Sequence, residues 1–360
     1  MNDILRPELI WIEGRCYRVN DPTAEISTLQ EHDLYENDMP YNDIDDEDDI
    51  DDDYEISQVD NNRYCTRLHV SKHYMGFVIG KKGATVGRIR RDTRTDIKIP
   101  KQGENNDITI YGSSISNVKA ARRRINIIVM SSRMKQPSTH FVSIPVNDTN
   151  IRNNFENFKE SVLQECSNSG LDDSLFIRSE KLHLTVGMLC LMDNEERMQA
   201  SELLMEAKEK YIIPILQDYL PLNVRLKGIS YMNDDPKQTH VLYARVEEAN
   251  APAGLLQRMV DAIVQHFYRA GLMEKEFGRD SVKMHVTLMN SKYKAEKKDL
   301  EEDSPRRRPR ESFDASQILE RFSDYDFGVT QLNDIHLSQR HCMGPDGYYQ
   351  STCIISCNKQ

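Results

Sequence analysis

Residues 181–187 read KLHLTVG and residues 283–289 read KMHVTLM, two copies of one pattern separated by 102 positions. In each copy a lysine, a histidine and a threonine alternate with apolar residues. Side chains two residues apart on a β-strand point to the same face. The copies therefore predict an internally repeated domain in which His183 and His285 occupy equivalent positions on two strands.

Two such histidines suit the hydrolysis of a phosphodiester. The pKa of an unperturbed histidine lies near ~6.5, so one imidazole can give a proton to the leaving oxygen while the other takes one from water. We expect the two histidines to be acid and base, in an order that the sequence does not assign. The threonine hydroxyls are expected to bind phosphate oxygens and the lysines to offset charge. The predicted catalytic set is His183, His285, Thr185 and Thr287, with Lys181 and Lys283 as candidate charge-balancing residues.

No metal or other cofactor is expected at this site. Neither copy of the pattern has Asp and His ligands at a metal-binding spacing nearby, and the seven cysteines contain no C-x-x-C pair. The C-terminal group of His341, Cys342, Cys353 and Cys357 lacks zinc-finger spacing. Scattered cysteines are typical of reduced thiols in an intracellular protein.

The residues around the two copies, from 137 to 360, mix strand-like and helix-like patterns and predict an α+β domain. Predicted strands cover residues 141–146, 182–191, 222–232, 240–246, 283–290, 329–337 and 350–357. Predicted amphipathic helices cover residues 154–166, 195–219 and 253–270. Residues 291–312 are almost all charged and lack an apolar period, which predicts a mobile inserted loop.

A basic segment precedes this domain. Residues 63–133 carry 16 Lys plus Arg against four Asp plus Glu, a net charge of +12 that favours a phosphate-bearing partner. Gly80-Lys81-Lys82-Gly83 lies between two short predicted helices, where backbone amides, helix ends and two cations can hold a phosphate. Two isoleucines on the next strand can form an apolar floor for unstacked bases. The predicted nucleic-acid contacts are Ile79, Gly80, Lys81, Lys82, Gly83, Arg88, Arg91, Ile97 and Ile99.

The N-terminal region has a different composition. Residues 31–60 hold 15 Asp plus Glu and no Lys or Arg, so we predict an acidic disordered linker over residues 31–62. The net charge of −11 for the whole chain thus comes from this one segment. Residues 1–30 contain a short alternating stretch around a Glu-Gly-Arg turn, which predicts a short hairpin or strand. It is either a loose terminal hairpin or a docking segment for a partner protein.

Two family resemblances follow from these motifs. The segment VIGKKGATVGRIRRDTRTDIKI, residues 78–99, resembles a type I KH domain, which implies a βααββα order and binding of about four nucleotides of single-stranded RNA, or alternatively DNA. The paired histidine motifs resemble the 2H phosphoesterase superfamily, which implies a two-lobed, pseudo-symmetric domain. The expected fold class is therefore α+β, a KH domain over residues 63–133 followed by a 2H domain.

The order of all these segments resembles a family of KH-containing 2H subunits of nuclear coactivator complexes. That resemblance implies a nuclear protein whose N-terminal segment docks on a large helicase subunit, in transcription and alkylation repair. The expected function is metal-independent phosphodiester hydrolysis on RNA. The alternative is a catalytically silent scaffold that binds RNA ends or nucleotides; an RNA ligase ranks last, because no nucleotide-charging lysine motif is present. No membrane partner is expected, since no apolar run approaches ~18 residues.

Overall fold

The computed structural model describes residues 8–12, 15–19, 55–60, 62–101, 107–166, 171–232, 234–273, 281–294 and 311–357. The chain separates into two compact units, Met1–Asp49 and Ile50–Gln360. Across the described ranges, the helices are too short or too polar to cross a membrane.

The first unit contains an antiparallel hairpin of β1 (Glu8–Ile12) and β2 (Arg15–Val19). Trp11 lies opposite Cys16 in its register. The predicted hairpin around the Glu-Gly-Arg turn is therefore confirmed. Most of the predicted acidic linker, residues 31–54, lies outside the described residues.

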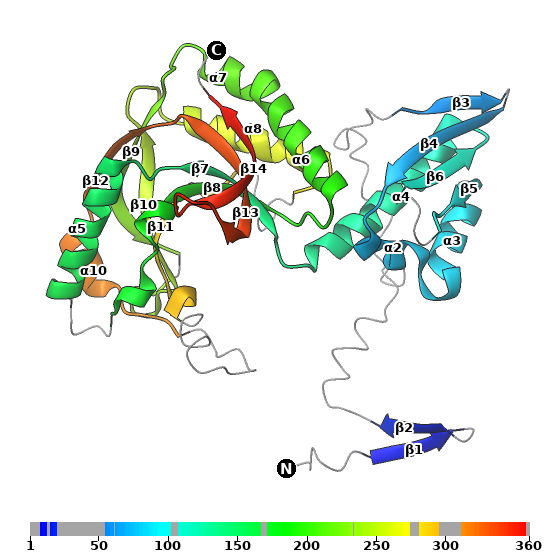
Figure 1. Cartoon of the computed structure of the whole chain (residues 1–360), viewed down its shortest axis with the longest axis horizontal. Coiled ribbons are helices and arrows are strands. Elements are labelled where there is room, and N and C mark those ends of the chain that lie inside the picture. The colour runs from blue at the N-terminus through cyan, green and yellow to red at the C-terminus, as the bar shows by residue number, and fades with distance from the viewer. Residues whose placement is uncertain are drawn as a thin grey trace. The chain divides into compact units, whose positions relative to one another are not determined.

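The second unit begins with the basic module, shown in blue and cyan in Figure 1. Its described strands form a four-stranded sheet in the order β3-β4-β6-β5. The elements are β3 (Ser57–Asp60), β4 (Arg63–His69), α2 (Lys72–Ile79), α3 (Ala84–Thr93), β5 (Thr95–Lys98), β6 (Asp107–Gly112) and α4 (Ile115–Met134). From β4 onward the order is βααββα, as predicted. Strand β3 was not predicted. It lies within the end of the predicted linker, residues 31–62, and pairs with β4.

Local sequence explains this module well. Residues of β6 alternate between half-buried and buried, which places Ile108 and Ile110 in the core. Helix α4 begins at Ser114, whose hydroxyl accepts a hydrogen bond from the Asn117 backbone amide at 3.2 Å. Its buried residues recur at helical spacing and face the sheet and α2.

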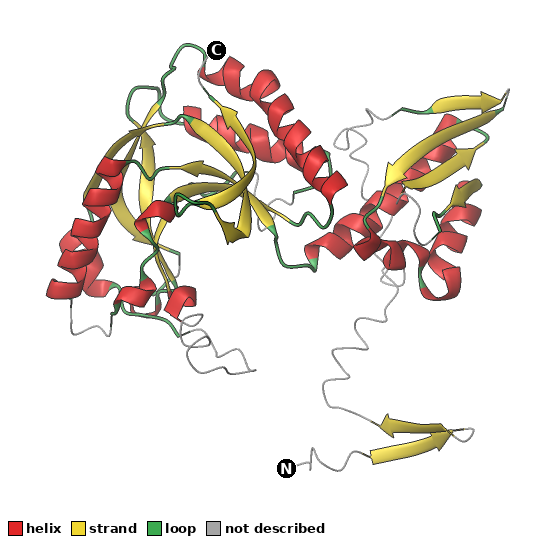
Figure 2. Cartoon of the chain, in the orientation of Figure 1, coloured by secondary structure: helices red, strands yellow, loops and turns green. Residues whose placement is uncertain are grey.

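The rest of the second unit is built on one sheet of eight described strands, in the order β12-β9-β10-β11-β8-β7-β13-β14 (yellow in Figure 2). Their bounds are β7 (His140–Pro145), β8 (His183–Leu189), β9 (Asn223–Tyr231), β10 (Val241–Glu248), β11 (Val286–Asn290), β12 (Asp326–Gln331), β13 (Asp334–Met343) and β14 (Tyr349–Ser356). Strands β8 and β11, which carry the two histidine motifs, meet at the centre. Four strands therefore lie in each half, which matches the expected two-lobed architecture.

Helices cover this sheet. Figure 1 shows α5 (Thr149–Glu165) beside β12 and α6 (Asn194–Ala207) beside β14. Helix α6 continues through a π-helical turn, Lys208–Ile212, into α7 (Ile213–Leu216), so the single helix predicted over residues 195–219 is divided. Helix α8 (Leu255–Arg269) follows the prediction closely, and α10 (Ser316–Phe322) was not predicted.

One predicted strand, residues 329–337, was wrong. The chain turns at Leu332 and Asn333, so β12 pairs with β9 at one edge of the sheet while β13 pairs with β7 and β14 in the other half. The Leu332 amide bonds the Leu222 carbonyl, and the Asn333 carbonyl accepts from Cys357, each at 2.8 Å. Apolar residues recur on both sides of this turn, at Val329, Leu332, Ile335 and Leu337, so the apolar pattern alone does not separate the two strands.

The two domains of the second unit are connected by specific side-chain contacts. Arg133, near the end of α4, pairs with Glu196 of α6 and donates to the Gly271 carbonyl. His69 lies between two carboxylates, with Nδ1 3.3 Å from Asp107 Oδ1 of the same module and Nε2 3.0 Å from Asp193 Oδ2. The Arg133 contacts hold the C-terminal end of α4, and the His69–Asp193 contact holds the end of β4, against the domain that carries the histidine motifs.

Candidate functional site

The two histidine motifs lie at adjacent strands of the sheet: β8 begins at His183, and β11 begins at Val286, directly after His285. Strands β8 and β11 run antiparallel, and Val286 pairs with Leu184. Counted on from this single registered pair, Thr287 falls across from His183, and His285, the residue before β11, falls across from Thr185. Side chains directly opposite in an antiparallel pair share a face. The sheet therefore brings all four predicted catalytic side chains together on one face, where both threonines are half-buried.

Each motif also has the same irregularity after its threonine. Thr185 pairs with Ser143 of β7, the next registered pair is Gly187 with Val142, and Val186 is left as the extra residue of a bulge. Thr287 pairs with Tyr243 of β10, and Leu288 is the extra residue there. Bulges re-aim the side chains that follow them and are frequent beside active sites. The repetition extends the internal symmetry beyond the sequence pattern.

Both histidines are oriented by a main-chain carbonyl two residues before them. His183 Nδ1 lies 2.6 Å from the Lys181 carbonyl oxygen, and His285 Nδ1 lies 2.7 Å from the Lys283 carbonyl oxygen. A carbonyl only accepts hydrogen bonds, so Nδ1 must carry the proton in each ring. Nε2 is then the atom that takes up or releases a proton in both histidines.

Aromatic residues enclose His183. The ring of Phe141 on β7 lies 5.1 Å from the imidazole between centroids, and those of Tyr348 and Tyr349 lie at 6.4 Å and 5.4 Å. Burial lowers the pKa of His183 to about 4, with smaller lowering contributions from the charges of His285 and Lys181 and an opposing one from the Lys181 carbonyl. His183 is therefore neutral at physiological pH.

The sequence analysis missed these aromatic residues, and it also missed Tyr243, whose ring centroid lies 5.5 Å from that of His285. Two of the tyrosines also contact the motif lysines: Lys181 Nζ lies 5.3 Å from the Tyr349 ring centroid, and Lys283 Nζ lies 5.0 Å from that of Tyr243. These are cation–π distances. The tyrosines lie on strands remote in sequence from the motifs, and strand pairing alone brings them to the site.

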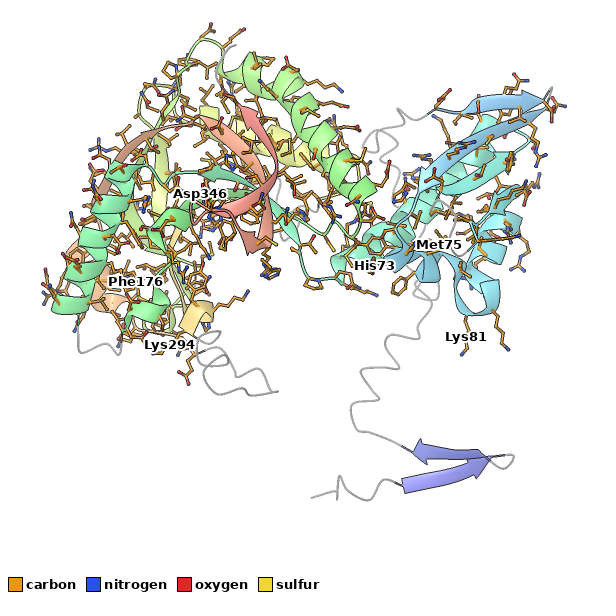
Figure 3. The ribbon with its side chains drawn as sticks, in the orientation of Figure 1. His73, Met75, Lys81, Phe176, Lys294 and Asp346 are labelled. Atoms are coloured by element: carbon orange, nitrogen blue, oxygen red, sulfur yellow. The ribbon has the colours of Figure 1, made fainter. Side chains whose placement is uncertain are left out.

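The loop Gly80-Lys81-Lys82-Gly83, here called the KH loop, forms a second, separate candidate site. Gly80 has φ +70°, and a Cβ there would meet the Thr85 side chain at 2.1 Å, so glycine is required. Gly83 has φ +81°, and Lys82 between them also adopts a positive φ of +53°. Lys81 and Lys82 are exposed, and Figure 3 shows Lys81 extending away from the module at the end of this loop. The loop presents two cations to solvent.

The other predicted nucleic-acid contacts differ in accessibility. Arg91 is exposed, while Arg88 and Ile79 are half-buried. Ile97 is fully buried in the core and presents no surface to a base, so its prediction as a nucleic-acid contact was wrong. Ile99 is half-buried and follows the end of β5. Phe77 on α2, 47% exposed, was not predicted and offers an aromatic surface near the loop.

Among the residues that the structure describes, no group of three or more His, Cys, Asp or Glu side chains is arranged to hold a metal ion.

Comparisons with known proteins match the two domains that carry these candidate sites. Residues 65–127 match the family model for the KH domain, and residues 138–356 match the model for the AKAP7 2′5′ RNA ligase-like domain. A mouse protein, activating signal cointegrator 1 complex subunit 1, is 36% identical over 97% of this chain and 98% of its own length.

Solved structures with similar folds match each domain separately. The first type I KH domain of human vigilin shares 23% identity over 24% of this chain and 92% of its own, with a TM-score of 0.21. LigT of E. coli in complex with NADP+ shares 12% identity over 61% of this chain and 98% of its own, with a TM-score of 0.33.

Proposed function

We propose that the KH domain of this chain grips single-stranded RNA while its 2′5′ RNA ligase-like domain hydrolyses a phosphodiester. The chain belongs to the activating signal cointegrator 1 complex subunit 1 family. The observation that carries this proposal is the arrangement of the two histidine motifs. Two imidazoles, each held by a main-chain carbonyl, and two threonine hydroxyls come together where β8 and β11 pair. Hydrolysis needs such a pair of proton-transfer groups on opposite sides of one phosphorus.

The different environments of the histidines suggest a direction for the reaction. His183, neutral because desolvation lowers its pKa, takes a proton from the attacking water through Nε2. The water oxygen bonds to phosphorus, the bond to the leaving oxygen breaks, and His285 gives its Nε2 proton to that oxygen. Positive charge on His285 disfavours protonation of His183, so the two rings favour opposite protonation states. Thr185 and Thr287 donate hydroxyl hydrogen bonds to the nonbridging phosphate oxygens.

The direct test uses a panel of RNA ends. The purified protein is incubated in EDTA with RNAs that end in a 2′,3′-cyclic phosphate, a 3′-hydroxyl or a 2′-5′ linkage, and products are resolved by mass. We expect hydrolysis of one class of end without a divalent metal. Activity that EDTA abolishes would contradict this mechanism. Binding of these ends without any product would favour the silent scaffold instead.

The N-terminal hairpin is the proposed docking element for a large helicase subunit in the nucleus. Two observations support this: the hairpin lies in a compact unit distinct from the one that holds both domains, and the mouse relative is named as a complex subunit. We expect deletion of residues 1–20 to abolish co-purification with that partner from nuclear extract. Hydrolysis by the isolated protein should not change. Co-purification that survives the deletion would move the docking site to the KH or phosphoesterase domain.

A further inference from the structure

A cavity of about 670 Å³ lies directly beside the catalytic strands. Strands β8 and β11 share a single registered pair in the described structure, and beyond it β8 faces residues 282–285 without a continuous ladder. The cavity occupies this position. Its lining comes from β8, from the segment after α8 and from the C-terminal end of α4, which belongs to the KH domain.

The cavity is continuous with the proposed phosphate site. Thr185, Lys283 and His285 line the cavity and are also members of the two histidine motifs. A phosphate held by these side chains would therefore have its attached nucleoside at the mouth of the cavity. Small-molecule sites commonly enclose ~300 to 1,000 Å³, so this volume admits one nucleoside.

The walls have a composition that suits a nucleobase. Four methionines line the cavity, Met130 and Met134 from the KH helix and Met188 and Met273 from the second domain. Met134 and Met188 remain 48% and 41% exposed, so large thioether surfaces are open to a ligand. Thioether sulfur is polarizable and makes favourable contacts with aromatic rings. A flat aromatic base is thus a better match for these walls than a sugar or a phosphate.

Two structural features hold this wall in place. In the register of β7 and β8, Thr185 lies opposite Ser143 and, after the bulge at Val186, Met188 lies opposite Phe141. Phe141 and Ser143 are two residues apart and share a face, so Met188 lies on the same face as Thr185. Arg133 of α4 is fixed by Glu196 and the Gly271 carbonyl, and its side chain is only 11% exposed. Arg133 therefore positions the end of α4 against the second domain. Gln136, which follows α4 and also lines the cavity, supplies an amide that can bond a base edge.

We propose that this cavity binds the nucleobase of the RNA nucleotide next to the scissile phosphate, with the KH helix α4 as one wall. The proposal rests on the proposed function, because it places the phosphate at the histidine motifs. The KH domain then has two roles, gripping the strand at its glycine loop and completing the nucleotide pocket of the other domain. A base enters such a pocket only when it is unpaired, so the favoured substrate is a single-stranded end.

The test compares ligands with and without a base on the full-length chain. The probes are adenosine 3′-monophosphate and inorganic phosphate, with affinities measured by isothermal titration calorimetry. In the Met134→Ala, Gln136→Ala double variant we expect the affinity for the nucleotide to fall about tenfold, because apolar contact area and a base-edge hydrogen bond are lost. Phosphate affinity should not change. Met198→Ala, which removes a 56% exposed methionine on α6 outside the cavity lining, is the matched control and should bind both probes as the native chain does.

The outcomes separate this inference from the proposed function. Nucleotide binding that is unchanged in the double variant, or lowered equally for inorganic phosphate, would overturn the base pocket even if hydrolysis is observed. Base-dependent binding that is lost in the double variant would support the pocket even if none of the RNA ends is hydrolysed. Because Met134 is the exposed last residue of α4, unfolding is not expected, and circular dichroism spectra of the variants check this.

Discussion

The two histidine motifs share a sequence pattern, a register and a bulge, yet their surroundings differ. His183 packs among three aromatic rings, and burial lowers its pKa to about 4. For His285 the described ring contact is with Tyr243. Equivalent residues on a symmetric frame thus have unequal surroundings. General acid–base catalysis needs this inequality, since identical groups in identical environments would not hold opposite protonation states.

The largest effect is expected from removing either imidazole. His183→Ala and His285→Ala should each lower the hydrolysis rate by about 10² to 10⁴, because each removes one proton-transfer group. The affinity for single-stranded RNA should change little in either variant, since the KH loop lies on a different domain. Rates from single-turnover assays and affinities from fluorescence anisotropy provide the two measurements. Hydrolysis that persists in both variants would contradict the assignment of the two histidines as acid and base.

A charge reversal in the KH loop should have the opposite result to the histidine variants: RNA affinity should fall and the hydrolysis rate should not. Lys81→Asp with Lys82→Asp places two negative charges where a phosphate is expected, so affinity for single-stranded RNA should fall about tenfold or more. Both side chains are exposed, so the fold is retained. The rate on a mononucleotide substrate too short to reach the loop should not change. A salt titration checks the assignment, because unchanged affinity and slope would show that this loop does not grip RNA.

A smaller effect, on pH dependence, tests the inequality between the histidines directly. The general base must be neutral, so kcat/KM should fall as the pH drops through the pKa of His183. That pKa is about 4, well below the ~6.5 of an unperturbed histidine. Tyr349→Leu opens the surroundings of His183 to water, weakens desolvation and should move this acid limb up by roughly one pH unit. Tyr243→Leu beside His285 is the matched control and should leave it in place. A fall in kcat/KM near pH 6.5 in the native chain would contradict the assignment of His183 as the base.

Much of the chain could be predicted because its signals are local. Apolar alternation on β6 and helical spacing on α4 specify the KH elements, and a left-handed backbone explains why Gly80 cannot be replaced. The repeated K-x-H-x-T pattern, through the two-residue period of a strand, indicates which side chains share a face. The apolar residues between 329 and 337 were an equally local signal but misleading, since they do not record the turn that sends β12 and β13 to different halves of the sheet.

The sequence by itself determined the identity of the chemical groups, since residue type and strand periodicity fix an imidazole and a hydroxyl on one face. Tertiary structure alone decided how those groups differ. Tyr349 and Phe141 reach His183 from strands far away in sequence, and the cavity wall beside Thr185 comes from another domain. Burial, and with it proton affinity and pocket shape, depends on distances through space. Those distances are set when the strands pair and α4 packs against the second domain.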